Sequence, residues 1–94
     1  MLYIFDIDGT IADTMGDNYE EAIPDEAMIT LVNMLYDREH TIVFITARGT
    51  SSGIDYTELT EKQLKDWGVN YDALQFGKII TDWAQNPEGF LNEI

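Results

Sequence analysis

The stretch Leu2-Tyr3-Ile4-Phe5-Asp6-Ile7-Asp8-Gly9-Thr10 shows best how this chain is organised. Its first four residues are a continuous apolar run, typical of a short strand that is buried on both faces of a parallel sheet. The run stops at two acids one residue apart. In extended backbone Asp6 and Asp8 leave the chain on the same side. The stretch therefore predicts a strand that delivers two carboxylates to one end of a sheet.

The rest of the chain alternates between strand-like and helix-like segments. Strands are expected at four places, 2–5, 41–45, 73–76 and 79–81. Helices are expected at three places, 25–38, 58–67 and a short one from Pro87 onward. Polar, irregular sequence predicts a long loop over 10–24 and a second one over 49–57.

Helical spacing of apolar residues predicts which faces of the two longer helices are buried. The first helix is expected to bury Ala27, Leu31, Met34 and Leu35, flanked by Met28 and Val32. The second is expected to carry Leu59, Gln63, Leu64 and Trp67 on one side, and to end at Gly68.

This alternation predicts one small α/β domain over residues 1–94, a Rossmann-like three-layer fold built on a short parallel sheet. Ligands of such sheets bind beyond the carboxyl ends of the strands. The polar residues that directly follow expected strands should therefore gather at one edge of the sheet. They are Asp6, Asp8, Thr46, Arg48 and Asp82.

The charge balance excludes several classes of partner. Eighteen acidic residues face five Lys and Arg, which gives a formal net charge of −13. Such a chain repels nucleic acids and anionic membranes and attracts metal cations, so neither nucleic acid nor membrane is an expected partner. No apolar run approaches the roughly 18 residues of a membrane helix. The absence of cysteine agrees with a cytoplasmic location. With so small a core, a homodimer is one expected assembly.

Clustered carboxylates at a strand edge suggest phosphoryl-transfer chemistry. Mg²⁺ removes the repulsion between neighbouring carboxylates and prefers oxygen ligands, including those of a substrate phosphate. One carboxylate can attack phosphorus as a nucleophile, and a second can move protons for the leaving group and for water. The hydroxyl of Thr46 can donate to a phosphate oxygen, and a lysine can neutralise developing charge.

These residues resemble the motifs of the haloacid dehalogenase (HAD) superfamily, in the order that the family has them. The run from Phe5 to Thr10 looks like motif I, and Ile45-Thr46-Ala47-Arg48 looks like motif II. Phe76-Gly77-Lys78 resembles the lysine-bearing motif III, and Thr81-Asp82 resembles a reduced acidic motif IV. The gaps between motifs are too short for a cap domain, so the chain resembles a small capless member.

The resemblance implies a role for each matching residue. Asp6 is expected to be the nucleophile and Asp8 the general acid/base, with Thr46 and Lys78 completing the catalytic set. Asp6, Asp8 (through its backbone carbonyl) and Asp82 are expected to hold Mg²⁺. Contacts with the phosphorylated substrate are expected from Thr10, Thr46, Ala47 and Arg48. The implied activity is hydrolysis of a phosphate monoester through an aspartyl-phosphate, on a small metabolite such as a sugar phosphate or nucleotide.

Two other readings stay open. Only three residues separate Lys78 from Asp82, and Thr81 stands where small family members often carry the first of two aspartates. A catalytically degenerate protein that only binds metal or a phosphorylated ligand would fit these departures. An acidic protein that occupies a basic partner surface would fit the charge. Arg48 itself is equally compatible with substrate binding and with pairing to an acid of this chain.

Overall fold

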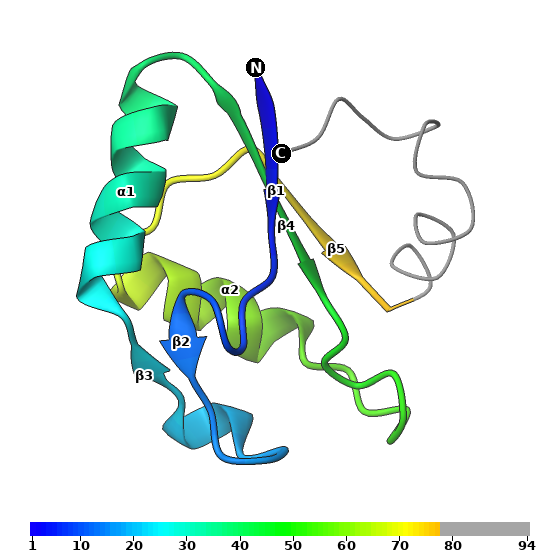
Figure 1. Ribbon diagram of the computed structural model, residues 1–94. Helices are drawn as coiled ribbons and strands as arrows, with labels where there is room; N and C mark the ends of the chain where they lie inside the picture. The colour runs from blue at the N-terminus through cyan, green and yellow to red at the C-terminus, as the bar shows by residue number, and fades with distance from the viewer. Residues whose placement is uncertain (78–94) are drawn as a thin grey trace.

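The computed structural model describes residues 1–77, in which a parallel sheet is covered by two helices (Figure 1). The elements follow one another as β1 (Leu2–Phe5), β2 (Ala12–Asp13), the 3-10 helix η1 (Tyr19–Glu21), β3 (Ile23–Pro24), α1 (Glu26–Asp37), β4 (Thr41–Thr46), α2 (Thr57–Asp66) and β5 (Ala73–Phe76). The expected strands at 2–5, 41–45 and 73–76 and both longer helices are confirmed. The strand expected at 79–81, the helix from Pro87, Lys78 and Asp82 lie outside the described residues, as does part of the expected domain 1–94.

The three longer strands run parallel in the order β1-β4-β5. In this register Phe5 lies opposite Phe44, and Thr46 lies opposite Phe76. The carboxyl ends of the strands therefore meet at one edge. The start of β4 is tied by Asp72, whose carboxylate accepts the N–H of Ile42 and whose own N–H donates to the Ile42 carbonyl, each at 2.8 Å.

The core lies between one face of the sheet and both helices. Ile42 and Phe44 alternate along β4 and are fully buried in one cluster with Val32 of α1 and Leu64 of α2. The connection from β1 through α1 to β4 and that from β4 through α2 to β5 step in the same direction across the sheet. Right-handed crossovers of this kind place their helices on the same face. Within residues 1–77 β1 is half-buried and has β4 as its one sheet neighbour.

The buried face of α1 differs from the expected one. The helix begins at Asp25, whose carboxylate caps it by accepting the N–H of Met28 at 3.1 Å. Ile29 and Val32 are the buried residues, and Met28 and Leu35 pack partly against the same cluster. The other apolar positions named for this face are exposed: Ala27, Leu31 and Met34. Both stripes are apolar, and the rotation of the helix on the sheet selects one of them.

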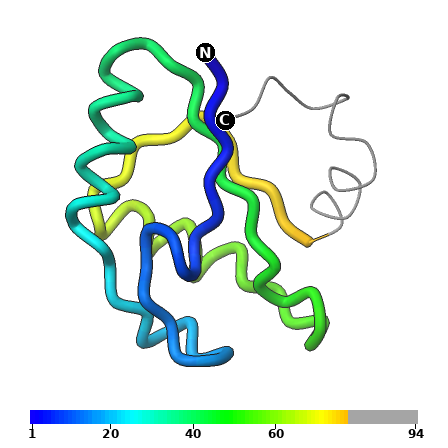
Figure 2. Tube along the Cα trace, in the orientation of Figure 1, coloured from blue at the N-terminus to red at the C-terminus, as the bar shows by residue number. Residues whose placement is uncertain are grey.

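The segment over 10–24 is more ordered than the expected irregular loop. β2 and β3 pair as a small antiparallel hairpin, with Ala12 opposite Pro24. The N–H of Asp25 donates to the Ile11 carbonyl at 2.8 Å, which ties the hairpin to the start of α1. This hairpin and the loop over 49–57 lie at the same end of the molecule, where the strands end (Figure 2). Neither segment holds a further domain.

The second helix ends as expected. Gly68 adopts a φ of 71°, a conformation that glycine takes without steric penalty. Asn33 of α1 then holds the following turn, donating to the Gly68 carbonyl and accepting the N–H of Asn70, each at 2.8 Å. Trp67 packs against the core. None of the helices among residues 1–77 is both long and apolar enough to cross a membrane.

Candidate functional site

A tight turn after β1 presents the two motif I acids. Ile7, which lies between them, is fully buried and anchors the turn. Its carbonyl accepts hydrogen bonds from the N–H groups of Thr10, Ile11 and Ala12 at 3.0–3.2 Å. Gly9 has a φ of 87°, a left-handed conformation that side chains disfavour. The turn therefore needs a glycine directly after Asp8, which explains the Asp-Gly pair.

Asp6 lies just past β1 with its side chain exposed. Its Oδ1 accepts the N–H of Ile7 at 2.8 Å, and no residue of 1–77 donates to its Oδ2. Burial by surrounding protein atoms raises the pKa of Asp6, the Asp8 charge adds to this rise, and the Ile7 hydrogen bond and Arg48 oppose it. Among residues 1–77, Asp6 thus keeps an accessible carboxylate oxygen that no side chain pairs with directly.

Asp8 is held on both carboxylate oxygens. Arg48 Nη2 donates to Oδ1 at 2.8 Å and Nε donates to Oδ2 at 2.9 Å, and the Thr14 hydroxyl donates to Oδ1 at 2.6 Å. Burial acts to raise the pKa of Asp8, but the hydrogen bonds from Arg48 and Thr14 outweigh it and leave that pKa lowered. Asp8 is therefore a fixed, ionised carboxylate in this structure.

Arg48 is the centre of a buried polar network. The residue is 3% exposed, and its Nη1 donates to the Thr60 hydroxyl at 3.1 Å and to the side-chain oxygen of Gln63. Its guanidinium carbon also lies 4.8 Å from the ring centroid of Tyr19. Gln63 in turn donates to the Tyr19 carbonyl at 2.6 Å. The network joins α2 and η1 to Asp8, so pairing with an acid is the role that this structure gives Arg48.

Sequence reasoning missed most partners of Arg48. Gln63 was expected on the packed side of its helix, but without a polar function, and no pattern marked Thr14, Tyr19 or Thr60. One weak signal could have pointed to them. Thr60 and Gln63 are polar residues three positions apart on the buried side of a helix, and buried polar side chains need hydrogen-bond partners. Arg48, two residues past the strand-end Thr46, is a cation that the expected topology places near this helix.

The other expected substrate contacts are placed at different depths. Thr46 is fully buried, and its hydroxyl accepts the N–H of Arg48 at 3.2 Å. Ala47 beside it is exposed. Thr10 lies in the turn and lines a cavity of about 300 Å³ with residues of the hairpin. The structure thus brings Asp8, Thr46 and Arg48 into contact at the strand edge and places Thr10 at a separate cavity.

The described residues supply only part of a metal site. Among residues 1–77 no three His, Cys, Asp or Glu side chains are grouped closely enough to hold a metal ion. The Asp8 carboxylate is occupied by Arg48, whereas its backbone carbonyl receives no hydrogen bond from residues 1–77. Asp6 and the Asp8 carbonyl are thus two oxygen donors that suit Mg²⁺. The third expected ligand, Asp82, lies outside the described residues.

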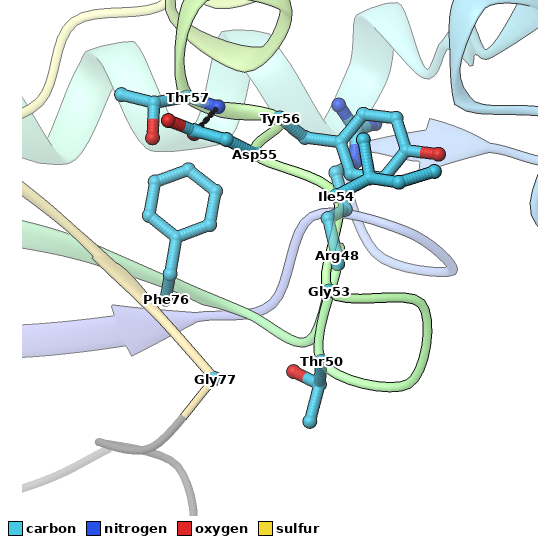
Figure 3. Close-up of a pocket in the computed structure, with 10 residues that line it drawn as sticks. Arg48, Thr50, Gly53, Ile54, Asp55, Tyr56, Thr57, Phe76 and Gly77 are labelled. Carbon is cyan, nitrogen blue, oxygen red and sulfur yellow. Dashed lines mark hydrogen bonds between the residues drawn. The ribbon is translucent and has the colours of Figure 1, made fainter.

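A second cavity, of about 290 Å³, opens beside the ends of β4 and β5. It is lined by Arg48, by the loop that follows it and by Phe76 and Gly77 (Figure 3). The N–H of Gly77 donates to the Thr46 carbonyl at 2.8 Å, so this cavity borders the strand edge that carries the site.

This chain is similar to solved structures but matches no sequence family. No family model matches the chain, and no curated protein matches it. A target protein from Vibrio cholerae has a TM-score of 0.74 at 24% identity, over 83% of this chain and 71% of that one.

Two further similar structures are a phosphatase and a chain of an RNA repair complex. D,D-heptose 1.7-bisphosphate phosphatase from B. bronchiseptica, complexed with magnesium and phosphate, has a TM-score of 0.58 at 23% identity, over 80% of this chain and 48% of that one. A chain of the Pnkp1/Rnl/Hen1 RNA repair complex has a TM-score of 0.64 at 18% identity, over 80% of this chain and 24% of that one. This chain therefore spans about half and about a quarter of those proteins. The parallel sheet and these likenesses show that the chain has a HAD-like α/β fold.

Proposed function

We propose that this chain hydrolyses the phosphate monoester of a small metabolite, with Mg²⁺ as cofactor and an aspartyl-phosphate on Asp6 as intermediate. The observation that carries the proposal is the contrast between the two motif I acids. Asp6 is exposed and one of its oxygens accepts no hydrogen bond from residues 1–77, whereas Asp8 is fixed on both oxygens. A nucleophile must reach its substrate, and a proton-transfer group must be positioned. The likeness to a phosphatase crystallised with magnesium and phosphate supports the same chemistry.

The proposed reaction has two steps that balance as hydrolysis. Asp6 Oδ2 attacks phosphorus and the bond to the ester oxygen breaks. Because Arg48 and Thr14 keep Asp8 ionised in this structure, Asp8 must gain a proton when substrate binds before it can protonate the leaving alcohol as general acid. Water, deprotonated by Asp8, then attacks the phosphorus of the aspartyl-phosphate and releases inorganic phosphate, which restores both acids.

The contacts of Asp8 favour the second step. Arg48 and Thr14 donate to its oxygens, which suits a carboxylate that accepts a proton from water. An acidic leaving group can depart as an anion, without a proton from Asp8. The first step therefore depends least on a protonated Asp8 when the leaving group is acidic. We therefore expect aryl phosphates to be turned over more readily than simple alkyl phosphates.

Mg²⁺ would be held by Asp6, the Asp8 carbonyl and Asp82, and would neutralise the charge of the phosphate. Phosphate contacts are proposed for Ala47, which is exposed, and for the hydroxyl of Thr46, which lies buried beside it. Lys78 is proposed to balance charge at the nucleophile. The remaining proposals concern partners: a small phosphorylated substrate, no nucleic acid, no membrane, a homodimer as one assembly, and a cytoplasmic location.

The test is Mg²⁺-dependent release of phosphate from an aryl phosphate by the full chain and by Asp6→Asn. We expect turnover that a chelator abolishes and that Asp6→Asn lowers by at least about a thousandfold, since it removes the nucleophile. Asp37→Asn, at the far end of α1, is the matched control and should keep wild-type turnover. Equal turnover by Asp6→Asn would refute the assignment. Binding of phosphate without any turnover would instead support the degenerate binding protein.

A further inference from the structure

The cavity beside β4 and β5 has a composition that the proposed catalytic steps do not use. Ile54, Asp55, Tyr56 and Phe76 are among its lining residues. In Figure 3 the Phe76 ring and the Asp55 carboxylate lie on one side of the loop, and the side chains of Ile54 and Tyr56 extend to the other side. The hydroxyl-bearing residues Thr50 and Thr57 also line it. Apolar and polar groups thus face one space of about 290 Å³, at the lower end of the roughly 300–1,000 Å³ of typical small-molecule sites.

The walls of this cavity are set by close backbone approaches. A Cβ at Gly49 would lie 2.1 Å from the Ile54 carbonyl oxygen, and the N–H of Gly53 donates to the Gly49 carbonyl at 2.9 Å. On the other side, a Cβ at Gly77 would lie 2.9 Å from the hydroxyl of Thr50. The loop therefore folds tightly on itself and against the end of β5, and the cavity is part of that arrangement.

The position of the cavity suits the leaving group of a phosphate ester. Phe76 is the register partner of Thr46, and Arg48, two residues past Thr46, contacts both Asp8 and the cavity. A phosphate bound at the strand edge would therefore have this cavity as a neighbour for the group to which it is esterified.

The lining groups favour a hydroxylated ring. An aromatic surface packs against the apolar face of a ring, and a carboxylate accepts hydrogen bonds from hydroxyl groups. Tyr56 is held by an edge-on contact with Tyr19, at 4.9 Å between ring centroids. The carboxylate of Asp55 accepts the N–H of Thr57 at 2.9 Å, and hydrogen bonding from Thr57 lowers the pKa of Asp55, so it is charged at neutral pH.

The charges of the lining disfavour a second anionic group. Four cationic side chains occur among residues 1–77, Arg38, Arg48, Lys62 and Lys65. Of these only Arg48 lines the cavity, and Asp8 already neutralises it. A second phosphate or a carboxylate placed in the cavity would meet Asp55 without a compensating charge from these residues.

We propose that this cavity binds the neutral, hydroxylated ring of a sugar monophosphate. The ring packs on Phe76 and donates hydroxyl hydrogen bonds to Asp55. The place of the phosphate rests on the proposed function. The cavity favours a glucose ring over a nucleoside, which has fewer hydroxyl groups to donate to Asp55. Judged by the charges of residues 1–77, it also disfavours a sugar bisphosphate, which carries a second anion.

The test is calorimetric binding to the full chain carrying Asp6→Asn, with Mg²⁺ present, so that bound ligand is not turned over. The probes are inorganic phosphate, glucose 1-phosphate, glucose 6-phosphate, glucose 1,6-bisphosphate and adenosine 5′-monophosphate. We expect at least one glucose monophosphate to bind at least tenfold more tightly than phosphate. Adenosine monophosphate and the bisphosphate should each bind less than threefold more tightly than inorganic phosphate.

Asp55→Asn, added to Asp6→Asn, isolates the charge because an asparagine oxygen can still accept the Thr57 N–H. Loss of a charged hydrogen-bond acceptor should weaken glucose monophosphate about tenfold and leave inorganic phosphate within twofold. The affinity for the bisphosphate should rise relative to that for the monophosphate, because the variant lacks the Asp55 charge. Asp37→Asn, on the same background, is the control and should change neither.

Three results would overturn the inference: glucose monophosphates no tighter than phosphate, adenosine monophosphate tightest of the probes, or Asp55→Asn without effect on sugar binding. Hydrolysis by the chain without Asp6→Asn separates the two proposals. Turnover of an aryl phosphate without sugar selectivity sinks only the sugar site. Sugar binding that depends on Asp55, without turnover of any monoester, sinks only the phosphatase.

Discussion

Arg48 holds both carboxylate oxygens of Asp8, with Nη2 to Oδ1 at 2.8 Å and Nε to Oδ2 at 2.9 Å. The Arg48 side chain is fully buried, whereas that of Asp8 is 25% exposed. This two-point contact fixes the direction in which Asp8 faces the strand edge. It also makes the acid that the HAD resemblance marks for proton transfer dependent on a residue 40 positions further along the chain.

Replacing Arg48 should destabilise the fold more than replacing a surface cation. Arg48→Met leaves the Asp8 charge partly buried without its partner and removes the donors to Thr60 and Gln63. We expect a loss of about 3 kcal/mol in the free energy of unfolding, measured with urea. Lys62→Gln breaks the exposed pair with Asp66 and is the control, with an expected loss below about 0.5 kcal/mol. Equal losses for the two variants would contradict a buried network.

The lowered pKa of Asp8 makes part of the stability depend on pH. Its ionised form is favoured in the folded state, so the stabilisation is fully present above the unfolded pKa of about 3.9. It is lost as pH falls below that value through the folded pKa. We expect the wild type to be more stable than Asp8→Asn at pH 7, with the difference shrinking in acid. Urea titrations of both proteins from pH 7 to pH 3 measure this. A difference that stays constant with pH would contradict the ion pair.

The contribution of Asp6 to stability should depend on pH in the opposite direction. Its raised pKa means that folding favours its protonated form, so its contribution to stability is lost as pH rises through the folded pKa. Asp6→Asn is therefore expected to be more stable than the wild type at pH 7, and the gain should vanish below about pH 4. The same urea titration measures it. A variant less stable than the wild type at pH 7 would show that Asp6 supports the fold rather than reactivity.

Much of the sheet could be predicted because its signals are local. β1 and β4 are apolar runs that stop at polar residues, and α2 stops at Gly68. Each strand end then places its next residue at a common edge, which is why Asp8 and Arg48 were expected near one another. The topology needed no contact information beyond the order of the elements.

The parts that could not be predicted depend on contacts between elements. α1 carries two apolar stripes, and only its packing on β4 decides that Val32 is buried and Leu31 is exposed. The two-residue strands β2 and β3 are too short for a pattern of their own. The partner of Arg48 could not be predicted because the chain has eighteen acidic residues. Only the fold selects Asp8, together with uncharged partners on α2.

Gly49→Ala should damage both the fold and the cavity proposed for the sugar ring. The added Cβ would meet the Ile54 carbonyl oxygen at 2.1 Å, and φ at this position is 82°, where side chains are strained. Residues 50–53 are exposed, so the loop can shift without opening the core. We expect a stability loss of about 2 kcal/mol by urea denaturation, and at least a tenfold loss of glucose monophosphate affinity on the Asp6→Asn background.

Gly16→Ala is the matched control for this substitution. Gly16 also has a positive φ, 55°, but no atom lies within 4 Å of its added Cβ. It should therefore lose about 1 kcal/mol from backbone strain alone and keep its sugar affinity. If Gly49→Ala matched Gly16→Ala in both measurements, the close approach of Gly49 to Ile54 would not shape the cavity. If its stability fell while sugar affinity stayed intact, the ring would bind elsewhere on the strand edge.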